Sequence, residues 1–194
     1  RMLRENRFRR LILLGDIFSD LNFGRLTKPH WKFLGSIRKL SNPKRGIEVV
    51  WVEGNHDRGL SDIMSHLVGV KVYEEYEWEF EGHRHIAIHG HQFDRFAVNN
   101  LVLSNVGTLI HLYLQKLDFK GKTFSRFLDR LNARWLRLSA KVASGAILHA
   151  RARQADRVFC GHTHQAQFIE RDGIAYYNSG SWTDFPPTYL TIDS

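Results

Sequence analysis

Four short apolar runs, each followed at once by glycine and polar side chains, constrain the fold of this chain more than any other feature of its sequence. The runs cover residues 11–14, 48–53, 85–89 and 157–160. The blocks at their ends are Gly15-Asp16, Gly54-Asn55-His56-Asp57, His89-Gly90-His91 and Gly161-His162-Thr163-His164. Short aliphatic runs are typical of buried parallel strands, whose carboxyl ends meet at one edge of a sheet. Ligands bind at that edge, so the sequence predicts a polar site there.

The segments between these runs predict an α/β fold in one domain over residues 1–194. Helical spacing of apolar residues indicates helices at 29–40 and 60–67. Alternating polar and apolar residues at 73–81 predict a hairpin with the strand at 85–89, in which His83 and His85 lie at the surface. Further strands are expected at 174–178 and 189–192.

Residues 95–153 break the alternation of strand and helix. Apolar residues recur there at helical spacing, and a second stripe with arginines between its members begins after Gly121. This pattern predicts a helical insertion within the domain. Its apolar stripes could be inter-helix core or could contact an apolar ligand, and both interpretations remain open.

The net charge of +8 indicates a polyanionic partner such as a phosphorylated substrate, an anionic membrane surface or nucleic acid. From Arg95 to Arg157 twelve Lys and Arg residues stand against three acidic residues. The single cysteine, Cys160, excludes an internal disulfide and fits a buried apolar position better than a nucleophile. No apolar run reaches the roughly 18 residues that span a bilayer, and we find no signal peptide. We therefore expect a cytoplasmic protein.

Carboxylate, amide oxygen and imidazole are the ligand types in the four blocks. They suit Mn, Fe or Zn better than Ca. His162 and His164 stand two residues apart on a turn that leaves a strand, so they can reach two neighbouring ions, and a carboxylate such as Asp16 can bridge both. Each block alone is commonly a turn or a cap. Four blocks in order, all at strand ends, favour a metal site.

The order of the blocks resembles that of the calcineurin-like metallophosphoesterases, whose pattern runs Asp-X-His, Gly-Asp, Gly-Asn-His-Asp/Glu, His, Gly-His-X-His. The resemblance implies a four-layer α/β/β/α sandwich with a helical lid, and metal-assisted hydrolysis with two divalent ions, Mn first and Fe or Zn as alternatives. It also implies a role for each matching residue. Asp16 would bridge the two ions. Asn55, His89 and His162 would complete the ligand set of one ion, and His164 would be a ligand of the other. His56, oriented by Asp57, would protonate the leaving group.

One motif of the family is absent, because no aspartate in the chain has histidine two places on. We expect an Asp-X-His strand to precede Arg1 in the natural protein. The alternative is a protein that has lost one metal site.

A narrower resemblance is to the bacterial UDP-2,3-diacylglucosamine pyrophosphatase-like branch, which acts in lipid A synthesis. It rests on Gly15-Asp16-Ile17-Phe18, on His89 to Asp94, on Phe159 to Ala166 and on Gly173 to Trp182. His91 and Ser181 depart from the pattern, because the branch has aspartate at the first position and often at the second. The resemblance implies a lipid-bearing phosphorylated substrate and a peripheral position on the inner membrane. The alternatives are a nucleic-acid or nucleotide phosphodiesterase, with nucleic acid the weaker partner, and a non-catalytic scaffold such as the retromer subunit of this fold.

Overall fold

The computed structural model describes residues 8–18, 23–59, 61–94, 122–182 and 186–193. The strands are β1 (Arg10–Leu14), β2 (Glu48–Val52), β3 (Val72–Tyr73), β4 (Glu75–Phe80), β5 (His83–Ile88), β6 (Arg157–Cys160), β7 (Gln167–Arg171) and β8 (Ile174–Asn178). The helices are α2 (Lys28–Leu40), α3 (Ser61–Val68) and α6 (Lys122–Ala152), with 3-10 turns η1 (Phe23–Arg25), η2 (Pro43–Arg45) and η3 (His91–Phe93).

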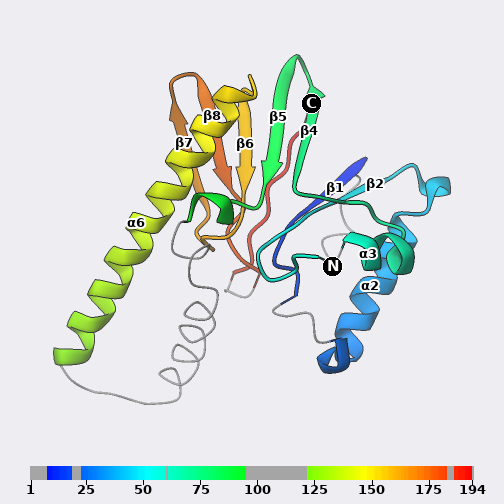
Figure 1. Cartoon of the computed structure of the whole chain (residues 1–194), viewed down its shortest axis with the longest axis horizontal. Helices are drawn as coiled ribbons and strands as arrows, with labels where there is room; N and C mark the ends of the chain where they lie inside the picture. The colour runs from blue at the N-terminus through cyan, green and yellow to red at the C-terminus, as the bar shows by residue number, and fades with distance from the viewer. Residues whose placement is uncertain (1–7, 19–22, 60, 95–121, 183–185, 194) are drawn as a thin grey trace.

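The strands form two sheets (Figure 1). The first sheet is parallel, in the order β1-β2-β3, with Leu14 opposite Val52. The second has the order β4-β5-β6-β8-β7, and its central pairs β5-β6 and β6-β8 are parallel. Strands were predicted at all four apolar runs that precede the polar blocks, and the structure has one at each.

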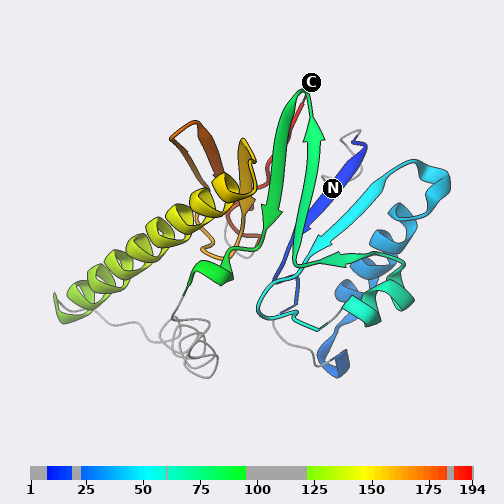
Figure 2. The same ribbon diagram turned by 45° about the horizontal axis from the view of Figure 1, so that its top comes forward.

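Three apolar clusters separate the layers of the molecule. Helices α2 and α3 cover the outer face of the first sheet, where Ile37 and Met64 pack with Trp51. Helix α6 covers the outer face of the second sheet through Ala146 and its neighbours. Between the sheets, Val52 packs with residues that include Ala87 and Phe159. The mixed α/β sandwich is therefore confirmed, and its layers run α/β/β/α (Figures 1 and 2).

Helix α6 has 31 residues, and its carboxyl-terminal part belongs to the outer layer of the sandwich. Val142, Ala143, Ala146, Ile147 and Ala150 are all buried. The second helix of the predicted insertion thus continues into the fold itself. Residues 95–121, which hold the first predicted helix, lie outside the described residues, and the role of a lid stays a prediction. In the part of the chain that the structure describes, no helix is long and apolar enough to cross a bilayer.

Two local expectations were wrong, and one strand was not predicted. Residues 189–192 form no strand; Ile192 instead packs against the inter-sheet cluster. The strand at 167–171 was missed because this edge strand is largely polar. His85 is buried rather than at the surface, because the alternation of β5 turns it inward with Ala87, between the rings of Trp78 and Phe159.

Two helical glycines offer a matched test of the packing of α6. A Cβ on Gly145 would lie 2.7 Å from Cδ1 of Phe93 in η3, whereas a Cβ on Gly35 of α2 would meet no described atom within 4 Å. Gly35→Ala should therefore raise the free energy of unfolding by about 1 kcal/mol through helix propensity. Gly145→Ala should lower it by about 1–3 kcal/mol through overpacking. Thermal or denaturant unfolding distinguishes them, and equal shifts would contradict the packing described.

Candidate metal centre

The carboxyl ends of β1, β2, β5 and β6 bring the four polar blocks together, because the pairs β1-β2 and β5-β6 are parallel. Asp16 follows β1, His89 follows β5 and His162 follows β6. Ligand atoms of these three side chains all lie within 4.8 Å of one another. Carboxylate and imidazole ligands from three separate strands thus converge on one point.

Two glycines permit this convergence. A Cβ on Gly15, which has a φ of 74°, would lie 2.6 Å from Nδ1 of His89. A Cβ on Gly54 would lie 2.2 Å from Oδ1 of Asp16. No larger residue fits at either place without displacing a ligand side chain, so the glycine beside each polar block has a steric cause.

Three residues of the predicted ligand set have the left-handed backbone conformation. The φ values are 50° for Asp16, 62° for His162 and 57° for His164. Such conformations cost of order 1 kcal/mol or more in non-glycine residues and cluster at functional sites, where the surrounding structure enforces them. The turns that follow β1 and β6 therefore hold these side chains in place at some cost in stability.

His89 is oriented as metal-binding histidines usually are. Its Nδ1 lies 2.6 Å from the carbonyl oxygen of Leu14 and donates to it. That bond fixes the tautomer and points Nε2 at Oδ2 of Asp16, 3.0 Å away. Nε2 is buried and makes no hydrogen bond among the described residues. A ring nitrogen held by a backbone carbonyl, with the other facing a carboxylate, is the second-shell pattern of a metal ligand.

His162 has a carboxylate partner that sequence reasoning missed. Its Nε2 lies 3.3 Å from Oδ2 of Asp94, and the Asp94 side chain is almost fully buried. Asp94 follows η3, 68 residues before His162 in the chain. The sequence did contain a signal for Asp94, because the segment His89 to Asp94 was one of those on which the narrower resemblance rests.

The electrostatics of the site favour the metal-binding forms of Asp16, His91 and His162, and they favour the protonated form of His89 as long as Asp16 is its only charged partner. Burial, and then the charge of His89, lower the pKa of His162 to about 4, and the pKa of His91 falls to about 4 for the same reasons. Burial would raise the pKa of Asp16, but His89 and the backbone N–H of His56 outweigh it and hold that pKa below its ordinary value. Burial would likewise lower the pKa of His89, but Asp16 holds it above its ordinary value. Neutral imidazole and ionised carboxylate are the forms that bind metals.

Two further polar atoms in the polar blocks are buried without a hydrogen-bond partner among the described residues. They are Oδ1 of Asn55 and Nδ1 of His91. The His91 ring lies 5.4 Å from that of His89 and 6.4 Å from that of His162. An unsatisfied buried polar atom costs about 1–3 kcal/mol, so both atoms indicate a polar ligand. The donor set of carboxylate, amide oxygen and imidazole fits a divalent metal of the Mn, Fe or Zn kind.

Asp57 anchors the turn after β2. It is buried, and its carboxylate accepts hydrogen bonds from the N–H groups of Gly54 (2.5 Å) and Ile17 (3.2 Å) and from Nε1 of Trp51 (3.2 Å). The backbone N–H of His56, in the same turn, donates to Oδ1 of Asp16 at 2.9 Å. Asp57 thus ties the turns of β1 and β2 together. Its predicted action on the His56 side chain stays a prediction.

The turn that holds His162 has a support of its own. The buried side-chain amide of Asn178 donates to the carbonyl oxygen of Gly161 at 2.6 Å and to Oγ1 of Thr163 at 3.1 Å. His164 lies on the same turn with an exposed side chain and is not part of the group formed by Asp16, His89 and His162. Its place as ligand of a second ion stays a prediction.

The profile of the calcineurin-like phosphoesterases matches residues 2–166. The chain belongs to that family. Membership of the family supports the prediction of a metal-dependent phosphoesterase that the sequence motifs gave. A search of the curated proteins finds no match.

The solved structures that are similar to this chain match it at low identity and with TM-scores below 0.5. An archaeal phosphodiesterase has 14% identity and a TM-score of 0.45, with coverage of 92% of this chain and 71% of that one. Vps29 of Entamoeba histolytica, as a double mutant, has 15% identity and a TM-score of 0.44, with coverage of 93% and 61%. Phosphopantetheinyl hydrolase of Mycobacterium tuberculosis has 15% identity and a TM-score of 0.45, with coverage of 95% and 86%. This chain thus spans less than two thirds of the Entamoeba protein.

Isosteric changes at two aspartates should separate metal binding from stability. Asp16→Asn should lower the bound Mn measured by metal analysis by tenfold or more, because it removes the carboxylate on which the ligands converge. Its melting temperature without metal should fall less than that of Asp57→Asn, because the amide oxygen of the new side chain can still accept from the N–H of His56. Asp57→Asn should cost about 3 kcal/mol in the free energy of unfolding, since three buried donors lose a charged acceptor. The opposite pattern would refute the assignment of the two carboxylates.

Proposed function

We propose that this phosphoesterase binds two divalent ions, with Mn as the preferred metal, and hydrolyses a phosphate ester or pyrophosphate bond. The observation that supports it best is the convergence of Asp16, His89 and His162. The buried, unsatisfied amide oxygen of Asn55, in the turn after β2, supports it as well. In this proposal Asp16 would contribute its carboxylate to both ions. Asn55, His89 and His162 would complete the ligand set of one ion, and His164 would be a ligand of the other.

Bound divalent ions supply Lewis acidity and acidify a water molecule at neutral pH. The chain's own residues prepare the ligands for that chemistry. The carbonyl of Leu14 orients the imidazole of His89, and the carboxylate of Asp94 orients that of His162. The backbone N–H of His56 holds one oxygen of Asp16. The site is thus organised by the protein itself rather than by a ligand.

His56 is proposed to donate a proton to the leaving group. Its backbone is held by Asp16, and the turn on which it lies is held by Asp57 through Gly54. These contacts keep the backbone of His56 beside Asp16, and His56 is not one of the three residues of the converging group, which supports a role other than metal binding. A side chain so placed can act on the substrate without binding metal.

The proposed substrate class is a lipid-bearing sugar nucleotide, as in the UDP-2,3-diacylglucosamine pyrophosphatase-like enzymes of lipid A synthesis. The blocks around Asp16, His89 and His162 support it, with His91 and Ser181 as departures. The charge of residues 95–157 supports it as well, because a pyrophosphate needs basic residues. Helix α6 also extends well beyond the second sheet, on the side away from α2 and α3 (Figure 1). We propose that it and residues 95–121 contact the acyl chains.

His56→Asn should lower kcat by about 10²–10⁴-fold while leaving the metal content unchanged. The loss should shrink for nitrophenyl esters, because a good leaving group needs little protonation. Steady-state kinetics on esters of graded leaving-group pKa measure this dependence. A loss of the same size across the series would assign His56 a different role.

Replacement of residues 96–135 by a short Gly-Ser linker tests the substrate class. The change keeps Asp94 and the buried part of α6 from Ser139 onward. It should abolish cleavage of a diacylated sugar nucleotide, since remote contacts contribute to its kcat, and spare a small soluble ester. Circular dichroism and the melting temperature verify that the variant is folded.

A folded variant that cleaves the lipid substrate at the parent rate would overturn the lipid assignment. Loss of both activities with intact metal binding would also contradict it. Salt-dependent binding of oligonucleotides that the replacement removes would favour the phosphodiesterase alternative.

A further inference from the structure

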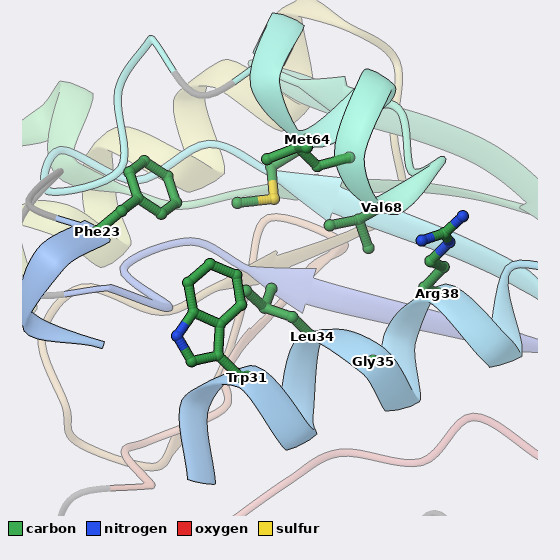
Figure 3. Close-up of a pocket in the computed structure, with 8 residues that line it drawn as sticks. Phe23, Trp31, Leu34, Gly35, Arg38, Met64 and Val68 are labelled. Carbon is green, nitrogen blue, oxygen red and sulfur yellow. The ribbon is translucent and has the colours of Figure 1, made fainter. Parts of the chain in front are cut away.

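An apolar groove lies between α2 and α3, on the outer face of the first sheet (Figure 3). Its volume is about 270 Å³. The lining comes from η1, α2 and α3, namely Phe23, Trp31, Leu34, Gly35, Arg38, Met64, Leu67 and Val68. None of these residues belongs to the metal centre, and the proposed reaction uses none of them.

The groove exists because the two helices turn only part of their apolar surface to the sheet. Leu34 and Met64 are buried in the cluster below. Trp31 remains 51% exposed and Leu67 57% exposed. Gly35 keeps the floor open between them, since no described atom lies within 4 Å of its Cβ position. Exposed apolar patches with a polar rim usually mark an interaction surface.

Arg38 is part of the lining of the groove, and the segment that contains it is strongly basic; we call Arg38 and the exposed Lys28 and Lys32 of the same helix the basic rim. From Phe23 to Ile47 the sequence has seven Lys and Arg residues and no Asp or Glu, and α3 adds the single acid Asp62. Lys28, Lys32 and Arg38 lie on α2 with exposed side chains. Such a surface complements an anionic partner that also has an apolar part.

One end of the groove lies at the end of the molecule that holds the candidate metal centre. Its lining at Phe23 and Trp31 lies in η1 and in the first turn of α2. In Figures 1 and 2 this end of α2 extends beyond the carboxyl ends of β1 and β2, from which Asp16 and Asn55 follow. A surface that contacts this end of α2 would therefore also lie close to the mouth of the site.

We infer that the α2–α3 groove and its basic rim dock this phosphoesterase on an anionic lipid bilayer. Trp31 and Leu67 enter the interfacial region, where tryptophan rings and aliphatic side chains are favoured. The basic side chains of α2 contact the lipid phosphates. A nucleic acid fits less well, because the aliphatic lining formed by Leu34, Leu67 and Val68 gives a phosphate backbone nothing to bind.

The test is sedimentation of the whole chain with vesicles of phosphatidylcholine mixed with phosphatidylglycerol, and with phosphatidylcholine alone. Binding should require the anionic lipid. Leu67→Ser should weaken it by about tenfold, as expected for loss of a buried leucine. The matched control is Phe168→Ser on β7, where the phenylalanine is 57% exposed, as Leu67 is, and the change should have no effect. Lys32→Glu should weaken binding by fivefold or more, and Arg171→Glu, also exposed on β7, should not.

A second readout comes from the groove itself. Gly35→Leu fills the floor with an apolar side chain, so it should leave vesicle binding intact or strengthen it. A blue shift of tryptophan emission on anionic vesicles should be lost in Trp31→Phe. All variants should hydrolyse a small soluble ester at the parent rate, which keeps a failure of docking distinct from a failure of the metal centre.

If a groove variant and its matched control lose vesicle binding equally, the inference is overturned. Absence of binding of the parent protein to the anionic vesicles would overturn it as well. Oligonucleotide binding that Lys32→Glu abolishes and Leu67→Ser leaves intact would also overturn it and assign the basic rim to nucleic acid.

Discussion

The close approach of β1, β2 and β5 at their carboxyl ends is the constraint on which the rest of the site depends. Gly15 lies against Gly54 and against the ring of His89, with no room for a Cβ on either glycine. Because the backbones meet this closely, the carboxylate of Asp16 reaches the imidazole of His89, although the two residues lie in different sheets. The metal centre is thus a direct result of how the two sheets pack.

Each of the three converging side chains, Asp16, His89 and His162, is held by a backbone or carboxylate group outside that set. Leu14 holds His89, Asp94 holds His162 and the N–H of His56 holds Asp16. Asp57 and Asn178 hold the turns on which the ligands lie. These bonds offset the strained backbone of Asp16 and His162. Stability and metal binding therefore rest on different residues that lie within a few positions of one another in the chain.

The parts of the structure that were predictable are those that depend on local pattern. The strands before Asp16, Asn55, His89 and His162 follow from short aliphatic runs, and their shared edge follows from parallel pairing. The parts that were missed depend on contacts between distant residues. Strand β7 is polar and is defined by its pairing with β8. The role of Asp94 becomes visible only when a residue 68 positions away folds back on it.

Crystals of the whole protein soaked in Mn²⁺ and measured at the manganese absorption edge would test the central claim most directly. The account predicts an anomalous peak within coordination distance of Oδ of Asp16 and the facing ring nitrogen of His89, with His162 and the amide oxygen of Asn55 completing the shell. That peak should vanish in the Asp16→Asn variant. Saturating Mn²⁺ with no peak at these side chains, or a peak that persists without the Asp16 carboxylate, would contradict it.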